Sequence, residues 1–372
     1  MARKKKNKEP IPFNGSHRFM AEELLSPSVG TTDLTRLNMF ISHWSQRLEL
    51  NDPEFPKVFT GFENQVGKFS PAYKRFPNKE GFVLVKEIIK NRYNRFYIFV
   101  NEKTKEVFTH LYSSSVKLTE DYGFLNVNRM ESVKEGDEIK PERIISRATC
   151  FDRFMNTLYG VNLKVAFYPW RAQTYEDSIV VNKKAAQALF STHVKKVKVA
   201  VNTNDIFMNI YGDNNHYKCF PNVGEKIVDK IILARRRLSF DSLLYDFSKE
   251  NMNRINYDTD DVFYSNNGTV TDIEIYCNAN IDDLEDREYA KQITEILRNN
   301  LRYYGEIVEV LKPYKDKGYK FLDESNYYLR RASDMISGKK FRDDSSDFDN
   351  LIVELKIEEP NPLTYGSKLT GR

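Results

Sequence analysis

KVAFYPWRAQTYEDSIVV, residues 164–181, is the stretch from which the fold of this chain is read. An apolar run breaks at Pro169-Trp170, a polar bend follows, Glu176 and Asp177 stand together, and the sequence becomes apolar again. Short apolar runs bounded by turn residues indicate buried strands, so the acidic pair is expected on a bend between two strands. Side chains alternate across a strand, so the two carboxylates cannot both chelate one ion directly. The pair either caps the helix that follows or belongs to a functional site.

The segments on both sides of this stretch predict a sheet and a capped helix. Asn182 precedes a run of good helix formers that ends near Phe190, and Asn is a favoured N-cap. Upstream, β-branched and aromatic residues form strand-like runs separated by turn residues. Consecutive hairpins of this kind predict an antiparallel sheet. The runs are residues 82–85, 95–100 and 107–112, with residues 101–105 as the turn between the last two.

An amphipathic helix is predicted from a cap at Asp33 to about Gln46, after a basic arm at residues 1–30. Its apolar residues recur at spacings of three and four, which places Leu37 on the buried stripe and Arg36 beside it. Spacing alone leaves open whether Arg36 is a solvated helix arginine or a functional one.

The second half of the chain is predicted as a long insertion followed by a closing strand. Residues 269–276 alternate between apolar and polar, which predicts a strand that is half exposed. Residues 282–301 form an amphipathic pattern of about five turns. We expect this helix to pack on its own subdomain, with a partner contact as the alternative. Residues 351–357 read as a strand, after which Pro360 and Pro362 bend the chain.

Length and composition limit the classes of protein that the chain can be. Its 372 residues allow two or three domains, and an apolar content of 40% excludes general disorder. The formal net charge is only +4, from 57 basic and 53 acidic residues, so any nucleic-acid surface has to be local. The clearest basic concentrations in the sequence are residues 3–8 and Arg235-Arg236-Arg237.

The cysteines and the hydropathy predict a soluble, cytoplasmic protein without zinc. Cys150, Cys219 and Cys277 are far apart and form no Cys-x-x-Cys pair, so neither a zinc site nor a redox dithiol is expected. No apolar run approaches the roughly 20 residues that a membrane helix needs. We therefore expect no membrane contact.

Five stretches, taken in order, resemble the β subunit of multisubunit DNA-dependent RNA polymerases, in its C-terminal portion. The most specific is LKVAFYPW running into YEDSIVV, which is similar to the family pattern N-x-x-V-A-F-M-P-W-x-G-Y-N-F/Y-E-D-S/A-I. Two others share a turn in which a glycine supplies a left-handed backbone position. The five are residues 163–181, VKEGDEI at 133–139, NVGEKIVDKIIL at 222–233, NGTVTDI at 267–273 and GSKLTGR at 366–372.

The resemblance implies a mixed, mainly β (α+β) fold that contains a portion of a double-psi β-barrel with an inserted flap. It divides the chain into an arm, a fork-like segment near the substrate, the first barrel portion, the flap-like insertion, and a closing strand with an incomplete lysine motif. The corresponding ranges are 1–30, 31–79, 80–190, 191–350 and 351–372.

The same resemblance implies which residues face the reaction. Glu176 and Asp177 match an acidic pair near the second magnesium, and Lys368 matches a lysine near the active centre that contacts RNA phosphate or substrate. Arg36 matches an arginine that reaches the triphosphate of the incoming nucleotide. Gln46 matches a glutamine near the 3′ end of the transcript, and Arg372 matches the arginine just beyond Lys368. Residues 43–45, 47 and 48 depart from the family pattern, and Gly-Ser-Lys alone is equally a plain turn.

The implied enzyme is a nucleotidyltransferase that this chain does not complete alone. The aspartate motif that holds the primary Mg²⁺ belongs to a β′-like partner and does not occur in this sequence. Expected partners are the β′-like chains, the remaining β-like fragments, DNA template, RNA transcript, NTPs, and an initiation or promoter-specificity factor at the flap.

Three further expectations concern the gene and the rival functions. The sequence stops at Arg372, immediately before an expected His-Gly-Asn-Lys-Gly, which suggests a split, interrupted or truncated subunit. A split β subunit is typical of giant-bacteriophage polymerases, made in the infected cell or packaged in the virion. The alternatives are a non-catalytic β-like scaffold and, less well supported, a metal-dependent nuclease that uses Glu176 and Asp177.

Overall fold

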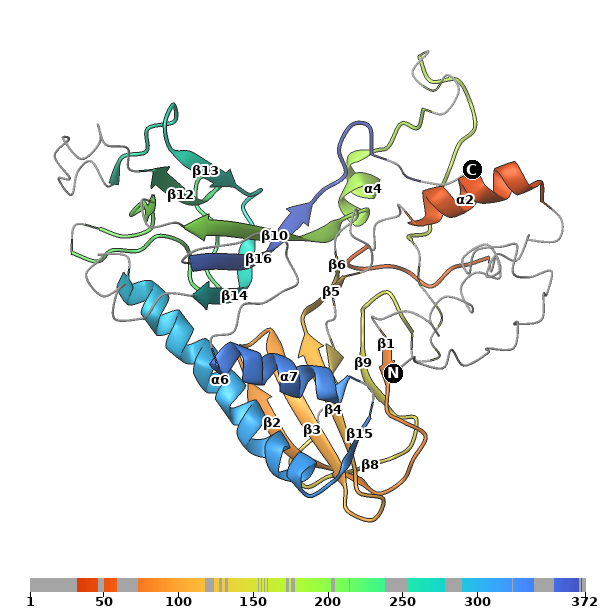
Figure 1. Cartoon of the computed structure of the whole chain (residues 1–372). Coiled ribbons are helices and arrows are strands. Elements are labelled where there is room, and N and C mark those ends of the chain that lie inside the picture. Colours follow the sequence, from red (N-terminus) through yellow and green to blue (C-terminus); the bar gives the residue numbers. More distant parts are fainter. Residues whose placement is uncertain are drawn as a thin grey trace, which may run out of the picture.

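The structure, a computed structural model, confirms a mixed α and β fold that is mainly sheet. In the residues it describes, the strands form open sheets and no closed barrel (Figure 1). The described residues are 32–45, 50–58, 73–117, 124–126, 129–130, 133–152, 154, 156, 158, 160–171, 174, 178–201, 205–213, 215–237, 253–277, 290–322, 324–337, 351–367 and 369.

The largest sheet contains the three strands that the sequence predicts. β2 (Phe82–Ile89), β3 (Asn94–Asn101) and β4 (Glu106–Ser113) form consecutive antiparallel hairpins. Two short strands complete it in the order β15-β4-β3-β2-β8, namely β8 (Glu138–Ile139) and β15 (Lys320–Phe321). β15 lies parallel to β4 although more than 200 residues separate them in sequence, so part of the predicted insertion joins this sheet.

A second sheet is organised around the last strand of the chain. β16 (Leu351–Asn361) lies between β10 (Ser191–Val201) and β14 (Thr269–Cys277) and is antiparallel to both. The expected bend at Pro360 is wrong, because β16 continues through Pro360 to Asn361 and ends directly before Pro362. β14 pairs with β16 only as far as Glu358, so Pro360 lies where β16 has a partner on one side only and the missing N–H is tolerated.

Among the described residues, the other strands form three smaller sheets. β12 (Ile231–Arg237) lies between the short strands β11 (Asp205–Phe207) and β13 (Asp261–Tyr264), and β9 (Ile144–Arg147) lies between the short strands β1 (Tyr73–Arg75) and β7 (Arg129–Met130). Gly136 and Gly224, in the two turns that the sequence marks as similar, have φ of 93° and 92°, which confirms the left-handed position expected there. The remaining elements are α2 (Leu34–Ser45), β5 (Ser115–Lys117), β6 (Phe124–Asn126), α4 (Lys183–Ala188), α6 (Ala290–Asp316) and α7 (Ser325–Ile336).

One helix, α6, packs against both large sheets (Figure 1). Its 27 residues extend well past the predicted end at Leu301, because Tyr304, Ile307 and Leu311 continue the apolar spacing. Residues 282–289 of the predicted helix lie outside the described residues. As expected, the helix packs on its own chain. Its first half contributes to the core beneath β10, β14 and β16, and its second half joins α7 over β2, β3 and β4.

The opposite face of the β2-β3-β4 sheet carries an aromatic core. Phe76 lies at its centre, with ring centroids 5.3 Å from Phe82, 5.0 Å from Phe99 and 5.0 Å from Phe108. All three contacts are edge-on, the arrangement that the quadrupoles of aromatic rings favour. The sheet is therefore buried on both faces.

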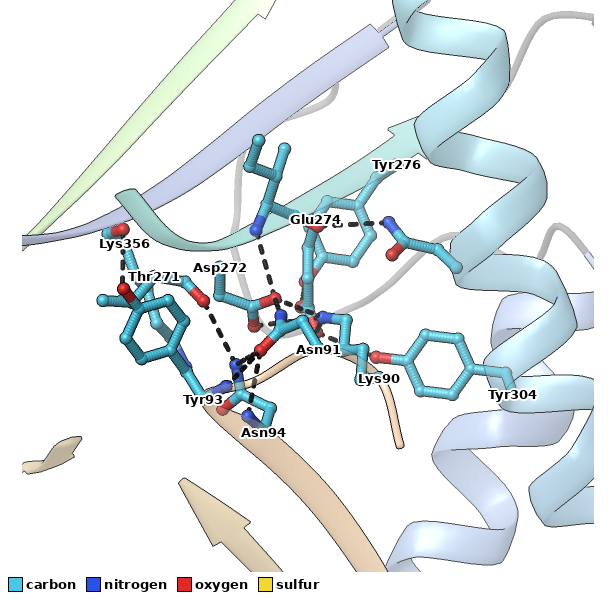
Figure 2. Close-up of polar contacts among 12 residues, drawn as sticks. Lys90, Asn91, Tyr93, Asn94, Thr271, Asp272, Glu274, Tyr276, Tyr304 and Lys356 are labelled. Atoms are coloured by element: carbon cyan, nitrogen blue, oxygen red, sulfur yellow. Dashed lines mark hydrogen bonds and ion pairs between the residues drawn. The ribbon is translucent and has the colours of Figure 1, made fainter. Parts of the chain in front are cut away.

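A buried ion network lies between the two large sheets (Figure 2). Lys90, directly after β2, places its Nζ 2.8 Å from Asp272 Oδ1 and 3.0 Å from Glu274 Oε1, both on β14. The three side chains are only 7%, 6% and 11% exposed. The prediction that the polar face of residues 269–276 meets solvent is wrong, because this face is covered by the end of β2 and by α6 and α7.

Further donors complete the network around Glu274. Arg331 on α7 lies 2.9 Å from Glu274 Oε2, and the hydroxyls of Tyr276 and Tyr304 donate to the same carboxylate at 2.6 and 2.9 Å. Burial raises the pKa of Glu274, but the charges of Lys90 and Arg331 outweigh it and hold the pKa well below its ordinary value. Burial also lowers the pKa of Lys90. The charges of Asp272 and Glu274 outweigh this effect and raise the pKa above its ordinary value. Lys90 and Glu274 are therefore both charged.

The histidine on β4 is buried in its neutral form. His110 Nε2 lies 3.1 Å from the Ser146 hydroxyl on β9, and the residue is buried. Burial, helped by the charge of Lys74, lowers the pKa of His110 from 6.5 to about 3. Protonation of this ring is therefore linked to unfolding.

Replacing Lys90 tests whether the ion network holds the two sheets together. We expect Lys90→Met to lower the free energy of unfolding by about 3–5 kcal/mol, because it leaves two buried carboxylates without their shared cation. The measurement is urea denaturation at neutral pH. The control is Lys86→Met, which removes an exposed pair with Glu135 at 3.5 Å and should cost less than about 1 kcal/mol. Equal losses in the two variants would refute the role of the network.

A second prediction concerns acid stability. The folded-state pKa of His110 lies below its unfolded value, so its contribution is complete above pH 6.5 and is lost as the pH falls toward 3. The unfolding free energy of the unmodified chain should fall as the pH drops from 6.5 to about 4.5. In His110→Gln this fall should be smaller by about 2–3 kcal/mol. His216→Gln, at a histidine whose side chain is 87% exposed, should retain the original slope. An unchanged slope in His110→Gln would contradict the assignment.

Candidate functional site

The bend in the stretch 164–181 is present and is closed by one threonine. Thr174 Oγ1 accepts a hydrogen bond from the Trp170 N–H at 2.7 Å and donates to the Tyr168 carbonyl at 3.1 Å. The rings of Tyr168 and Trp170 meet edge-on at 5.8 Å, and the guanidinium of Arg171 lies 5.4 Å from the Trp170 ring. The polar residues of the bend thus fix the aromatic pair that precedes it.

The runs on either side of the bend are not the buried strands that the sequence predicts. Residues 161–170 and 178–182 have no regular structure, and Phe167 is 96% exposed. Val165 and Ile179 are also exposed, at 69% and 58%. Among the described residues no sheet edge pairs with these runs, so their apolar character does not translate into burial within this chain. An apolar surface of this kind is typical of a site that another molecule covers.

The loop after α2 holds the beginning of this stretch. Asn162 donates from its side chain and its backbone to Glu54 Oε2 at 2.9 and 3.0 Å, and from its side chain to the Phe55 carbonyl at 2.9 Å. The Lys57 N–H donates to Asn162 Oδ1 at 3.2 Å, and the Glu54 N–H donates to the Gly160 carbonyl at 2.8 Å. These contacts lower the pKa of Glu54, chiefly through the hydrogen bonds from Asn162. Five hydrogen bonds therefore connect segments more than 100 residues apart.

The same loop also holds the end of the stretch. The Asn51 N–H donates to the Phe190 carbonyl at 2.9 Å, and Leu50 forms an isolated bridge with Ser191. Between these points Asn182 caps α4, its side chain accepting from the Ala185 N–H at 2.8 Å, as predicted. The segment from α2 onward thus contacts both ends of residues 160–191.

The C-terminal motif leaves the second sheet at the same place. Ser191, the first residue of β10, is opposite Asn361, the last residue of β16. The Asn361 amide donates to the Ser191 hydroxyl at 2.9 Å. We call the meeting of Leu50, Ser191 and Asn361 the Ser191 junction. Residues 50–58 lead into this junction, α4 precedes Ser191, and residues 362–367 follow Asn361.

Of the residues that the sequence singles out, one can be placed directly. Arg36 is exposed on α2, beside the buried Leu37. Gln46, Glu176, Asp177, Lys368 and Arg372 lie outside the described residues, so their roles stay predictions. The turn just before Lys368 is described: the Ser367 N–H donates to the Thr364 carbonyl at 3.1 Å, and Gly366 has φ of 81°.

Sequence reasoning missed the residues that assemble the site. Asn51, Glu54, Asn162, Ser191 and Asn361 act only through contacts across more than 100 residues, and nothing in their local sequence marks them. The one local signal was the Asn182 cap. The assembly of this site is therefore a tertiary property.

Within the ranges that the structure describes, no three His, Cys, Asp or Glu side chains converge where they could hold a metal ion. Cys150, Cys219 and Cys277 form no disulfide. No described helix is both long and apolar enough to cross a membrane.

The sequence of this chain matches a known protein family and two curated proteins. The family model described as RNA polymerase Rpb2, domain 6, matches residues 87–372. The chain is 28% identical over 214 residues to the DNA-directed RNA polymerase subunit beta of Flavobacterium johnsoniae, a match that covers 54% of this chain and 16% of the relative. It is 26% identical over 230 residues to the same subunit of Borreliella afzelii, with 61% and 19% covered. The matched part thus spans less than one fifth of each relative.

The clamp between Glu54 and Asn162 can be tested by hydrogen exchange. Asn162→Ala removes the side-chain bonds that hold residues 54–57 to residues 160–162. We expect the backbone amides of both segments to exchange roughly tenfold faster, which corresponds to about 1.4 kcal/mol of lost local stability. Asn215→Ala, on another exposed loop, is the matched control. If exchange in both segments stayed at the original rate, the clamp would not hold the stretch in place.

Proposed function

The chain belongs to the RNA polymerase Rpb2 domain 6 family, and from this premise we propose that it is one part of the β subunit of a phage-type multisubunit DNA-directed RNA polymerase. In this role it contributes triphosphate, second-metal and RNA contacts to nucleotidyl transfer, and a flap near RNA exit. It acts only when assembled with β′-like chains and the remaining β-like chains.

The observation that carries the proposal is the Ser191 junction. The candidate residues are scattered from position 36 to position 372, and a catalytic role needs them within reach of one substrate. The pairing of Ser191 with Asn361 and the bridge from Leu50 bring together the three segments from which these residues extend. Two of the three segments also fall within the family match at residues 87–372.

The proposed roles follow from the chemistry of each side chain. Arg36 suits the triphosphate, because a guanidinium presents a planar set of donors to phosphate oxygens. Lys368 acts as a compact positive charge toward RNA phosphate or substrate, and Arg372 follows it. Glu176 and Asp177 stand near the second Mg²⁺ site, with at most one of them approaching the ion. The primary Mg²⁺ would be held by the β′-like partner. When bound, Mg²⁺ would neutralise charge on the leaving pyrophosphate.

The exposed apolar surface of residues 163–170 supports the need for partners. Phe167 and Val165 extend into solvent although neighbouring polar residues are ordered around them. Covering such side chains is worth about 1.5–3 kcal/mol each. We therefore assign this surface to a contact with another chain of the polymerase.

The flap and its factor contact form the least constrained part of the proposal. α6, which contains part of the predicted factor-binding helix, uses Ile293 and Leu297 for the chain's own core. Only its exposed side, with Lys291, Glu295 and Arg298, is left for an initiation or promoter-specificity factor. The factor contact is thus limited to a polar surface.

Substitution of the acidic pair tests the catalytic role. In the reconstituted polymerase, Glu176→Ala with Asp177→Ala should slow nucleotide addition at least roughly a hundredfold while the subunits still assemble. The measurement is single-nucleotide extension of a preformed RNA–DNA scaffold by quenched flow, with assembly followed by gel filtration. Asp258→Ala with Glu309→Ala, which removes two exposed carboxylates, is the matched control.

The same experiment separates the proposal from its rival. Near-normal extension by the Glu176 and Asp177 variant, together with normal extension by Lys368→Ala, would show a β-like scaffold that serves only assembly. Polymerisation by this chain without a β′-like partner would overturn the assignment of the primary metal to another chain.

A further inference from the structure

A strongly basic surface lies at the far end of α6, away from the Ser191 junction. It consists of residues 312–320, where α6 ends and β15 begins, and residues 101–105, the turn between β3 and β4. We call it the basic tip. Its six lysines are all exposed: Lys103, Lys105, Lys312, Lys315, Lys317 and Lys320.

The basic tip carries a net positive charge of its own. Its two segments hold six lysines and two acidic residues, Glu102 and Asp316, so six minus two gives a local charge of +4. The formal net charge of the entire chain is also +4. The positive charge of the basic tip is thus carried by two short segments that lie side by side.

The arginine cluster at residues 235–237 shows the opposite arrangement. Arg235 lies 2.6 Å from Asp261, Arg236 lies 2.7 Å from Asp260, and Arg237 lies 3.6 Å from Asp205. These aspartates neutralise the positive charge that the sequence suggested for residues 235–237. Among the described residues, none of the six lysines of the basic tip forms an ion pair.

The two segments of the basic tip are held in fixed relation. The Lys320 N–H donates to the Lys105 carbonyl at 2.8 Å, at the start of the parallel pairing of β15 with β4. The Tyr319 hydroxyl donates to the Glu102 carboxylate, and the Tyr319 ring meets Tyr314 edge-on at 5.2 Å. Gly318, with φ of 77°, lets the chain reverse at the end of α6. The lysines therefore extend from an ordered platform.

We propose that the basic tip binds the phosphodiester backbone of a nucleic acid. This inference rests on the proposed function, because a polymerase subunit works beside DNA and RNA. Backbone binding is carried by lysines and arginines that neutralise phosphates and release counterions. Protein interfaces are instead depleted in lysine and rely on buried aromatic or arginine anchors, which the exposed side chains of the basic tip lack. The contact is independent of base sequence, because lysines on flexible stems read charge and not base edges.

The test compares two variants of equal charge in the full chain. In the tip variant, Lys103, Lys105, Lys315 and Lys317 are changed to Gln. In the control variant, four exposed lysines elsewhere are changed to Gln, namely Lys134, Lys140, Lys230 and Lys291. Binding of labelled 20-base-pair DNA and of a 20-nucleotide RNA is measured by fluorescence anisotropy across a salt series. Thermal unfolding verifies that both variants are folded.

We expect the tip variant to bind at least tenfold more weakly at low salt, while the control variant binds like the original chain. The slope of log Kd against log salt should fall by about two to four for duplex DNA, since each lost phosphate contact removes about 0.9. The DNA and RNA arms distinguish which backbone is preferred. Equal losses in the two variants, or unchanged binding by the tip variant, would overturn the proposal.

A poly-glutamate competitor of equal charge separates nucleic acid from an acidic protein partner. If poly-glutamate displaced the nucleic acid as well as unlabelled DNA does, a general affinity for polyanions would replace the proposed contact. The assay needs no other polymerase chain and no nucleotide addition. A negative result therefore leaves the test of Glu176 and Asp177 unaffected, and a failure of that test leaves the binding result interpretable.

Discussion

The structure depends on the buried pairing of Lys90 with Asp272 and Glu274. This pairing joins the end of β2 to β14 across 182 residues of sequence, in a place where an unpaired charge would be costly. Arg331 from α7 and Tyr304 from α6 also contact the Glu274 carboxylate, so four elements meet at one buried cluster. Hydrophobic contacts supply most of the stability, but this cluster admits only one relative placement of the two sheets.

The placement of the two sheets sets what lies at each end of the molecule. β16 lies beside β14, and its last residue, Asn361, pairs with Ser191 at the start of β10. The loop after α2 reaches the same place through Leu50. α6 spans both cores and carries its lysine-rich end to the β3-β4 turn. One end of the structure therefore brings Leu50, Ser191 and Asn361 together, and the other end carries the lysines of the basic tip.

The sequence predicted well where the signal is local. The strands at residues 82–113, the Asn182 cap and the left-handed Gly136 all follow from the properties of neighbouring residues, and the structure confirms them. It predicted poorly where burial depends on distant partners. Asp272 and Glu274 look like a solvent face until Lys90 and Arg331 are known, and Phe167 looks like a core residue although no described part of this chain covers it.

By itself the sequence determined the secondary structure of the main sheet and the motifs that relate this chain to the polymerase family. Both depend on residues only a few positions apart, since hydrogen-bond periodicity and turn chemistry act over a few residues. Only the tertiary structure decided which faces are buried, where α6 ends its packing, and that Leu50, Ser191 and Asn361 meet. Those outcomes depend on contacts between residues more than 100 positions apart, whose free energy appears only when the chain has closed upon itself.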